Sequence, residues 1–220
     1  MKSDILFDLD GTLTDPKPGI CACIRFALER LGKPCPPDQE LETCIGPPLQ
    51  ESFARLLGDP ALVPSAVAAY RERFKESGMY ENTVYPGIED LLVSLAPRAR
   101  LWVATSKPQV FAEAILSHFR LDTYFTGVYG SALDGTRSDK GELLEYGRAR
   151  EGWMPQSTVM VGDRRQDMDA AIRHAFAALG VLWGYGSRSE LLEAGAGAVA
   201  ETPLEAFGYL KRFQEYGNFL

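Results

Sequence analysis

Two aspartates stand where an apolar segment near the start of the chain ends. Residues 5–7, Ile-Leu-Phe, have the length and composition typical of a strand buried on both faces of a parallel sheet, and Asp8, Asp10 and Gly11 follow closely. In open α/β sheets, ligands bind at the carboxyl ends of the strands. Two carboxylates two residues apart share a side of an extended chain, so a hard cation such as Mg²⁺ would relieve their mutual repulsion. A solvated turn is the alternative interpretation of these residues taken alone.

Further polar residues that could complete such a site follow later in the chain. Thr105, Ser106 and Asp163 each come after an apolar run typical of a strand, and Asp167 lies four residues beyond Asp163. Lys140 opens a predicted helix. Because the carboxyl ends of parallel strands meet at one edge of a sheet, these groups could lie together.

The order of these residues resembles the haloacid dehalogenase superfamily, specifically its phosphatases with a helical cap. The four matching motifs are Asp8-Leu9-Asp10-Gly11-Thr12, Thr105, Lys140 and Gly162-Asp163-x-x-x-Asp167. They span nearly the whole chain, and four ordered motifs are more specific than any one of them. Residues 13–16 (Leu-Thr-Asp-Pro) and 183–186 (Trp-Gly-Tyr-Gly) look most like the phosphoglycolate phosphatase-like and 5′-nucleotidase-like branch.

The resemblance implies a covalent route for the hydrolysis of a phosphate monoester. Asp8 corresponds to the nucleophile that becomes an aspartyl-phosphate. Asp10 corresponds to the general acid that protonates the leaving oxygen and then to the general base that activates water, for which its pKa must rise toward neutrality. Lys140 corresponds to the catalytic lysine that steadies Asp8 and the phosphoryl group. Lys107 competes for that role, and the sequence alone does not exclude it.

Mg²⁺ is the cofactor that the resemblance implies. The implied metal ligands are oxygen atoms of four aspartates: Asp8, Asp10 (through its backbone carbonyl), Asp163 and Asp167. Asp167 could instead accept hydrogen bonds behind the ligands or merely cap a helix. Thr105, the backbone amide of Ser106, and Lys140 would bind the substrate phosphate, while Arg164 and Arg165 are expected to be solvated.

Strand-like and helical segments alternate after residue 87, which predicts an α/β fold with a parallel, Rossmann-like sheet and helices on both faces. The predicted strands after the first are 101–104, 127–129, 158–161 and 177–182, and the predicted helices are 88–96, 108–119, 140–151, 166–175 and 203–213. Residues 15–83 have helical patterns and are too long for a simple crossover. We therefore expect a catalytic core of residues 1–14 and 84–220 with an inserted, all-helical cap of residues 15–83.

The cap is expected to set the substrate, because the core residues recognise only phosphate and metal. Candidate residues are Lys17, Ile20, Arg25 and the turn Gly46-Pro47-Pro48. The expected substrate is a small phosphorylated metabolite, with a nucleoside 5′-monophosphate favoured over 2-phosphoglycolate. A sugar phosphomutase is an alternative enzyme. A catalytically silent binding module is the alternative from another class, which is disfavoured because every motif position is intact.

The composition is that of an ordinary soluble globular protein, with 45% hydrophobic and 24% charged residues. A net charge of −7 argues against nucleic-acid polymers as partners. No apolar run approaches the roughly 20 residues that span a bilayer, and the N-terminus lacks a signal-peptide pattern, so we expect a cytoplasmic monomer or homodimer without a membrane partner. The four cysteines lack metal-binding spacing and are expected to be reduced thiols.

Overall fold

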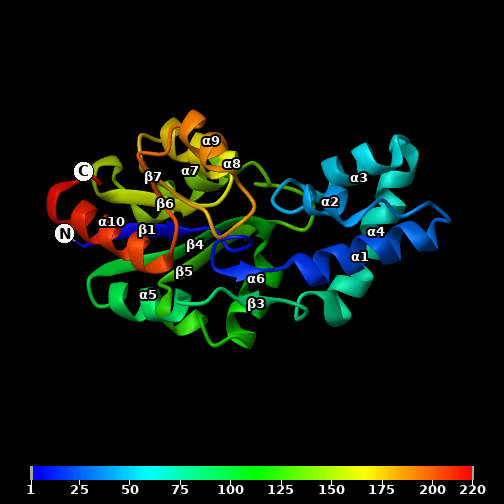
Figure 1. The fold of residues 1–220 in the computed structure, drawn as a ribbon, viewed down its shortest axis with the longest axis horizontal. Helices are drawn as coiled ribbons and strands as arrows, with labels where there is room; N and C mark the ends of the chain where they lie inside the picture. Colours follow the sequence, from blue (N-terminus) through cyan, green and yellow to red (C-terminus); the bar gives the residue numbers. More distant parts are fainter. Residues whose placement is uncertain (1, 220) are drawn as a thin grey trace. The chain divides into compact units, whose positions relative to one another are not determined.

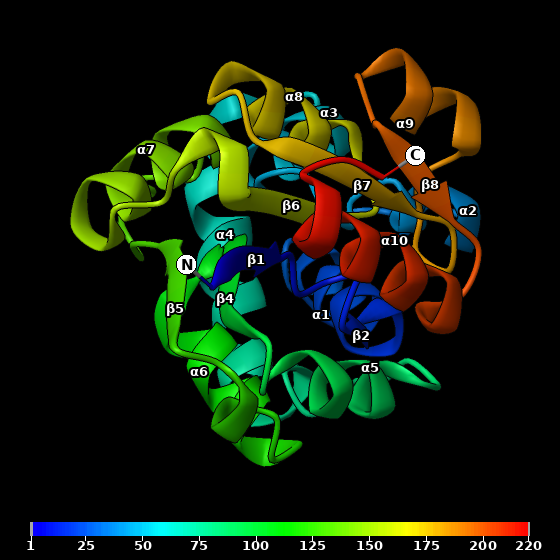
Figure 2. The same ribbon diagram turned by 90° about the vertical axis from the view of Figure 1, so that its left-hand side faces the viewer.

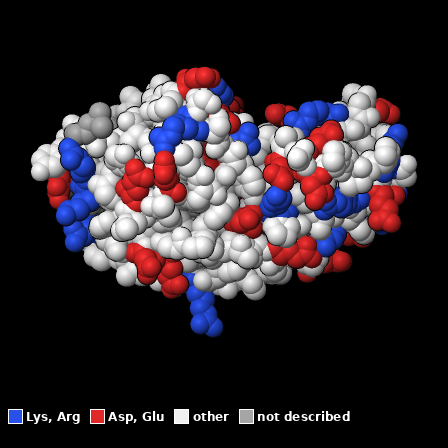
Figure 3. Space-filling model, in the orientation of Figure 1, with Lys and Arg blue, Asp and Glu red and all other residues white. Residues whose placement is uncertain are grey.

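The computed structural model describes residues 2–219 and divides the chain into two compact units (Figure 1). Met1–Thr14 and Val84–Leu220 together form the larger unit, and Asp15–Thr83 form the smaller one. In the part of the chain that the structure describes, no helix is long and apolar enough to cross a membrane. Figure 3 shows acidic and basic side chains interspersed over much of the visible face.

The larger unit is built on a six-stranded parallel sheet in the order β5-β4-β1-β6-β7-β8. Its strands are β1 (Ser3–Phe7), β4 (Ala99–Pro108), β5 (Gly127–Ser131), β6 (Thr158–Gly162), β7 (Ala177–Val181) and β8 (Ala198–Ala200). On one side of β1 lie β4 and then β5, and on the other side lie β6, β7 and β8, so the strand order reverses direction at β1. There, Phe7 of β1 lies between Val103 of β4 and Val161 of β6. Such a switch point is where open α/β sheets bind ligands. The prediction of a parallel α/β fold is therefore confirmed.

Helices cover both faces of this sheet. They are α5 (Ile88–Leu95), α6 (Gln109–His118), α7 (Lys140–Glu151), α8 (Arg165–Arg173), α9 (Arg188–Glu193) and α10 (Pro203–Tyr216). Figure 2 shows α7 and α8 on one side of the strands and α5 and α10 on the other. Leu6, Trp102 and Met160 on neighbouring strands pack with Trp153 and residues of α7 and α8 in one buried cluster. Strand β8 and helix α9 were not predicted from the sequence.

The smaller unit is helical between two short strands, β2 (Thr14–Asp15) and β3 (Thr83–Val84), which pair with each other where the chain passes between the units. Its helices are α1 (Lys17–Arg30), α2 (Asp38–Glu42), α3 (Leu49–Leu57) and α4 (Val63–Arg73), with a 3₁₀ turn at Pro60–Leu62 and a π-helical turn at Phe74–Gly78. The rings of Tyr70 and Phe74 stack at 5.4 Å between centroids, and the edge of Phe53 contacts Tyr70. This unit therefore has a hydrophobic core of its own.

Candidate active site

Three buried aspartates meet at the carboxyl ends of the central strands. Asp8 follows β1, Asp163 follows β6, and Asp167 lies in the first turn of α8. One carboxylate oxygen from each lies within 4.8 Å of the other two. Buried carboxylates this close repel one another unless cations or protons neutralise them. The chain thus places together three of the four residues predicted as metal ligands.

Lys140 supplies positive charge to this cluster from the start of α7. Its Nζ lies 2.8 Å from Oδ1 of Asp8 and 2.8 Å from Oδ1 of Asp167, and it donates a hydrogen bond of 3.0 Å to the carbonyl of Ala104. Burial alone would lower the pKa of Lys140, but the charges of Asp167 and Asp8 outweigh it and raise that pKa above its ordinary value. The ammonium therefore stays charged although the side chain is only 4% exposed.

One ammonium does not neutralise three carboxylates. Burial, reinforced by the charges of Asp167 and Asp8, raises the pKa of Asp163 well above its ordinary value. Burial also raises the pKa of Asp167 to about 6, although Lys140 opposes the increase. Apart from their ion pairs with Lys140, the Oδ1 atoms of Asp8 and Asp167 are buried without a hydrogen-bond partner. The excess negative charge and the close approach of the three carboxylates fit a divalent cation such as Mg²⁺.

Asp10 lies beside a different lysine. The Nζ of Lys107 is 2.5 Å from Oδ2 of Asp10, and the two side chains are 7% and 13% exposed. Oδ1 of Asp10 is buried without a hydrogen-bond partner. Burial raises the pKa of Asp10 above its ordinary value, and Lys107 opposes but does not cancel that increase. The two lysines that competed for one role in the sequence thus contact different aspartates, Lys140 the pair Asp8 and Asp167, and Lys107 Asp10.

Thr105 and Ser106 lie within β4, which extends beyond the predicted strand 101–104. Thr105 follows the apolar run, as expected, but it is still paired with Gly130 of β5, so the strand ends later than predicted. The strand continues because backbone pairing with β5 does not require apolar side chains. The Oγ1 of Thr105 accepts a hydrogen bond of 3.3 Å from the amide of Lys107, and the carbonyl of Ser106 accepts one of 2.8 Å from Ser131.

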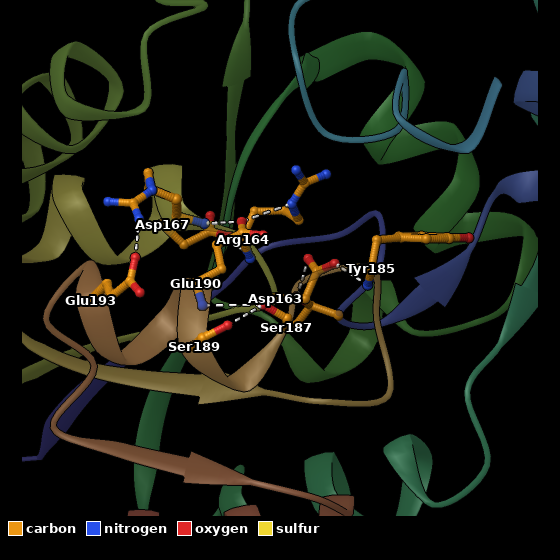
Figure 4. Close-up of polar contacts among 10 residues, drawn as sticks. Asp163, Arg164, Asp167, Tyr185, Ser187, Ser189, Glu190 and Glu193 are labelled. Carbon is orange, nitrogen blue, oxygen red and sulfur yellow. Dashed lines mark hydrogen bonds and ion pairs between the residues drawn. The ribbon is translucent and has the colours of Figure 1, made fainter. Parts of the chain in front are cut away.

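The loop after β7 holds the carboxylate of Asp163 (Figure 4). The amide of Tyr185 donates a hydrogen bond of 2.8 Å to Oδ2, and the hydroxyl of Thr12 donates one of 3.3 Å to Oδ1. A Cβ on Gly184 would lie 2.4 Å from Oδ2, so only glycine allows the loop this close. Residues 183–186 carry part of the family resemblance, but their contact with Asp163 was not predicted from the sequence.

The residues expected to set the substrate lie in the smaller unit. Lys17 forms an ion pair of 2.5 Å with Glu42, and Arg25 forms one with Asp38. Ile20 is buried. Two of the candidate charges are thus paired within their own unit, and a role for any of these residues in substrate selection stays a prediction.

A family model described as haloacid dehalogenase-like hydrolase matches residues 5–181. The chain belongs to this family. The hydrolase is 49% identical over 190 residues to a 5′-nucleotidase of Pseudomonas aeruginosa, with 86% of each chain covered. It is 30% identical over 192 residues to a phosphoglycolate phosphatase of Pseudomonas putida, covering 82% of this chain and 70% of that protein.

Two further comparisons bear on this hydrolase. Tyrosine-protein kinase PtkA of Mycobacterium tuberculosis is 38% identical over 183 residues, which cover 83% of this chain and 62% of that protein. The crystal structure of a protein described as a predicted phosphatase from Clostridium acetobutylicum superposes with a TM-score of 0.91 and 38% identity, covering 98% of this chain and 99% of that one. The fold and the family are therefore established together.

Proposed function

We propose that this hydrolase is a Mg²⁺-dependent phosphatase that cleaves a small phosphate monoester through an aspartyl-phosphate. The observation that carries the proposal is the buried cluster of Asp8, Asp163 and Asp167 with Lys140 against it. The nearby Asp10, with its raised pKa, supplies an acid and base. The preferred substrate is a nucleoside 5′-monophosphate, supported by the relative named 5′-nucleotidase, and 2-phosphoglycolate is the alternative.

The metal would be held by the carboxylates of Asp8, Asp163 and Asp167 and by the backbone carbonyl of Asp10. The first three already lie close enough to share one ion. Bound Mg²⁺ would neutralise the excess charge of the cluster and polarise a phosphoryl oxygen. Lys140 would contribute a second, permanent positive charge on the side of Asp8 and Asp167.

In the first step, a carboxylate oxygen of Asp8 attacks phosphorus, and a bond from that oxygen to phosphorus forms as the bond to the alcohol oxygen breaks. The alcohol oxygen leaves with the electron pair and takes a proton from Asp10. A carboxyl group can give this proton near neutral pH only if its pKa is raised, as burial does for Asp10.

In the second step, Asp10, now ionised, takes a proton from water while the water oxygen attacks phosphorus. The bond between phosphorus and Asp8 breaks, inorganic phosphate leaves, and both aspartates return to their starting states. Lys107 stabilises the ionised form of Asp10 that this step requires. Thr105, the amide of Ser106 and Lys140 would hold the phosphoryl oxygens during both steps.

An acceptor of the phosphoryl group other than water would change the second step of the reaction but not the attack of Asp8 on phosphorus. If a sugar hydroxyl instead of water received the phosphoryl group, the protein would be a phosphomutase. If a tyrosine received it, the activity would correspond to the name of the relative PtkA. The molecule that accepts the phosphoryl group from phosphorylated Asp8 thus separates these functions.

The test is phosphate release from a panel of phosphate monoesters with Mg²⁺. The panel includes nucleoside 5′-monophosphates, 2-phosphoglycolate, sugar phosphates and phosphotyrosine. We expect the highest kcat/KM for a nucleoside 5′-monophosphate and no release after chelation with EDTA. A preference for 2-phosphoglycolate would replace the substrate but keep the chemistry. Full turnover in EDTA, or no phosphate release from any ester, would refute the proposed phosphatase.

A further inference from the structure

We propose that residues 183–190, the segment that follows β7, form a brace that fixes the metal-binding aspartates, with Trp183 and Glu190 as its positioning residues. The inference rests on the proposed function, because Asp163 and Asp167 are ligands only if the site binds Mg²⁺. The brace consists of two separate hydrogen-bonded connections, one to each aspartate (Figure 4).

The first connection runs from Trp183 to Asp163. The indole Nε1 of Trp183 donates a hydrogen bond of 2.9 Å to the carbonyl of Thr12. The hydroxyl of the same Thr12 donates to Oδ1 of Asp163, and the amide of Tyr185, two residues after Trp183, donates to Oδ2. The hydrogen bond from Trp183 therefore links the segment of Thr12, which binds Oδ1 of Asp163, to the segment of Tyr185, which binds Oδ2.

The second connection runs from Glu190 to Asp167. Oε1 of Glu190 accepts hydrogen bonds from Nε of Arg164 at 3.0 Å and from the amide of Arg165 at 2.9 Å. The amide of Arg164 in turn donates to Oδ2 of Asp167 at 3.1 Å. The expectation that Arg164 is solvated is therefore wrong, because Glu190, on the unpredicted helix α9, pairs with its guanidinium.

Close packing leaves the brace little freedom to move relative to Asp163. A Cβ on Gly186 would lie 1.9 Å from the carbonyl oxygen of Asp163, and one on Gly184 would lie 2.3 Å from the carbonyl oxygen of Gly11. Backbone therefore packs on backbone at these two positions.

The brace has a direct consequence for the metal. If the brace did not hold them, the carboxylates of Asp163 and Asp167 would repel each other and turn apart in the metal-free protein. Each would then have to be reoriented when Mg²⁺ binds. Groups that hold metal ligands in place are typically worth 10-fold to 100-fold in metal affinity. We infer that Trp183 and Glu190 raise the affinity for Mg²⁺ by preorganising Asp163 and Asp167.

The test compares Mg²⁺ binding by calorimetry in the full-length wild type and in Trp183→Phe and Glu190→Ala. The first variant keeps an aromatic ring and removes the indole donor. Both should bind Mg²⁺ about 10-fold more weakly and regain most of their kcat when Mg²⁺ is raised. Glu190→Gln, which keeps an acceptor oxygen, should recover much of the affinity. The matched control is Glu193→Ala, because the ion pair of Glu193, at 3.4 Å, is with the exposed guanidinium of Arg165 and not with the backbone beside Asp167.

The outcomes separate this proposal from the proposed function. If the wild type binds Mg²⁺ and both variants bind it equally well, the brace is refuted and the metal-dependent phosphatase stands. If the wild type does not bind Mg²⁺, the metal role of the site fails and the brace fails with it. If Glu190→Ala does not fold, Trp183→Phe decides the question alone. An equal loss of affinity in Glu193→Ala would also refute the brace, since that residue is paired with the exposed guanidinium of Arg165.

Discussion

The ammonium of Lys107 lies 2.5 Å from Oδ2 of Asp10, so the proposed proton donor forms an ion pair with a lysine. The pair has opposite effects on the two proposed steps. It disfavours the protonated Asp10 needed to release the alcohol, and it favours the ionised Asp10 needed to activate water. Burial still raises the pKa of Asp10, which leaves the donor form accessible.

Replacing Lys107 by Met should move the alkaline limb of the pH profile of kcat/KM to higher pH. Lys107 lowers the pKa of Asp10, so its removal raises that pKa, and the donor form survives to higher pH. The measurement is kcat/KM against pH for wild type and variant. Lys211→Met, at an exposed lysine, is the control and should leave the profile unchanged. A shift of the alkaline limb to lower pH would contradict the role of Asp10 as proton donor.

Asp8→Asn should abolish turnover while the fold persists. The amide is a poor nucleophile, so kcat should fall by roughly 10³-fold or more. The same change removes one of the charges that repel Asp163 and Asp167, so the metal-free variant should unfold at a temperature no lower than the wild type. Steady-state kinetics and thermal unfolding in EDTA measure the two effects. Retention of wild-type rates by a folded Asp8→Asn would exclude Asp8 as the nucleophile.

Asp167 makes the stability of the metal-free protein depend on pH. Its pKa rises from 3.8 in the unfolded chain to about 6 in the folded one, so the folded state binds more protons between these values. Stability contributed by the protonated form is complete below pH 4 and is lost as the pH rises through about 6. The loss corresponds to roughly 3 kcal/mol at most.

Asp167→Asn isolates this contribution, because asparagine does not titrate. In EDTA, the free energies of unfolding of wild type and variant should diverge between pH 4 and 6, with the variant becoming relatively more stable as the pH rises. Urea unfolding at several pH values measures the difference. Saturating Mg²⁺ should reduce the advantage of the variant, since the ion neutralises the carboxylate. A constant difference across this range would show that Asp167 ionises normally in the folded protein.

Part of the candidate site could be predicted from local patterns in the sequence, and part only from the family resemblance. Asp8 and Asp163 follow apolar strands, which local pattern reveals, whereas Lys140 is preferred over Lys107 because of its place among the family motifs. The parallel sheet then brings such strand ends together whatever the distance in sequence. The fold could be predicted in a similar way, because alternating strands and helices indicate a parallel sheet covered by helices.

The contacts that orient these residues could not be predicted in this way. Glu190 lies on α9, a helix of six residues that is too short to show a clear period, and its partner Arg164 looks like any solvated arginine. The partner of Trp183 is a backbone carbonyl 171 residues away, at Thr12, and sequence patterns do not reveal such pairs. The strand β8 is only three residues long, Ala-Val-Ala, and carries too little pattern to be recognised.

Gly11 and Gly135 offer a matched pair that separates backbone strain from damage to the site. Both have left-handed backbone angles, with φ of +84° and +93°. A Cβ at Gly11 would lie 2.2 Å from Oδ2 of Asp163, whereas one at Gly135 would meet nothing within 4 Å. Alanine at either position carries the cost of the left-handed conformation, on the order of 1 kcal/mol.

Only Gly11→Ala should also displace Asp163 and weaken Mg²⁺ binding. We expect Gly135→Ala to lose about 1 kcal/mol of stability and to keep wild-type kinetics. Gly11→Ala should lose more stability, and its affinity for Mg²⁺ should fall by about 10-fold or more, because the added carbon occupies the space of a ligand oxygen. Urea unfolding and calorimetry with Mg²⁺ measure both effects in both variants. Equal affinities for Mg²⁺ in the two variants would mean that the backbone at Gly11 shifts to accommodate the alanine without moving Asp163. This result would count against a rigid site around this aspartate.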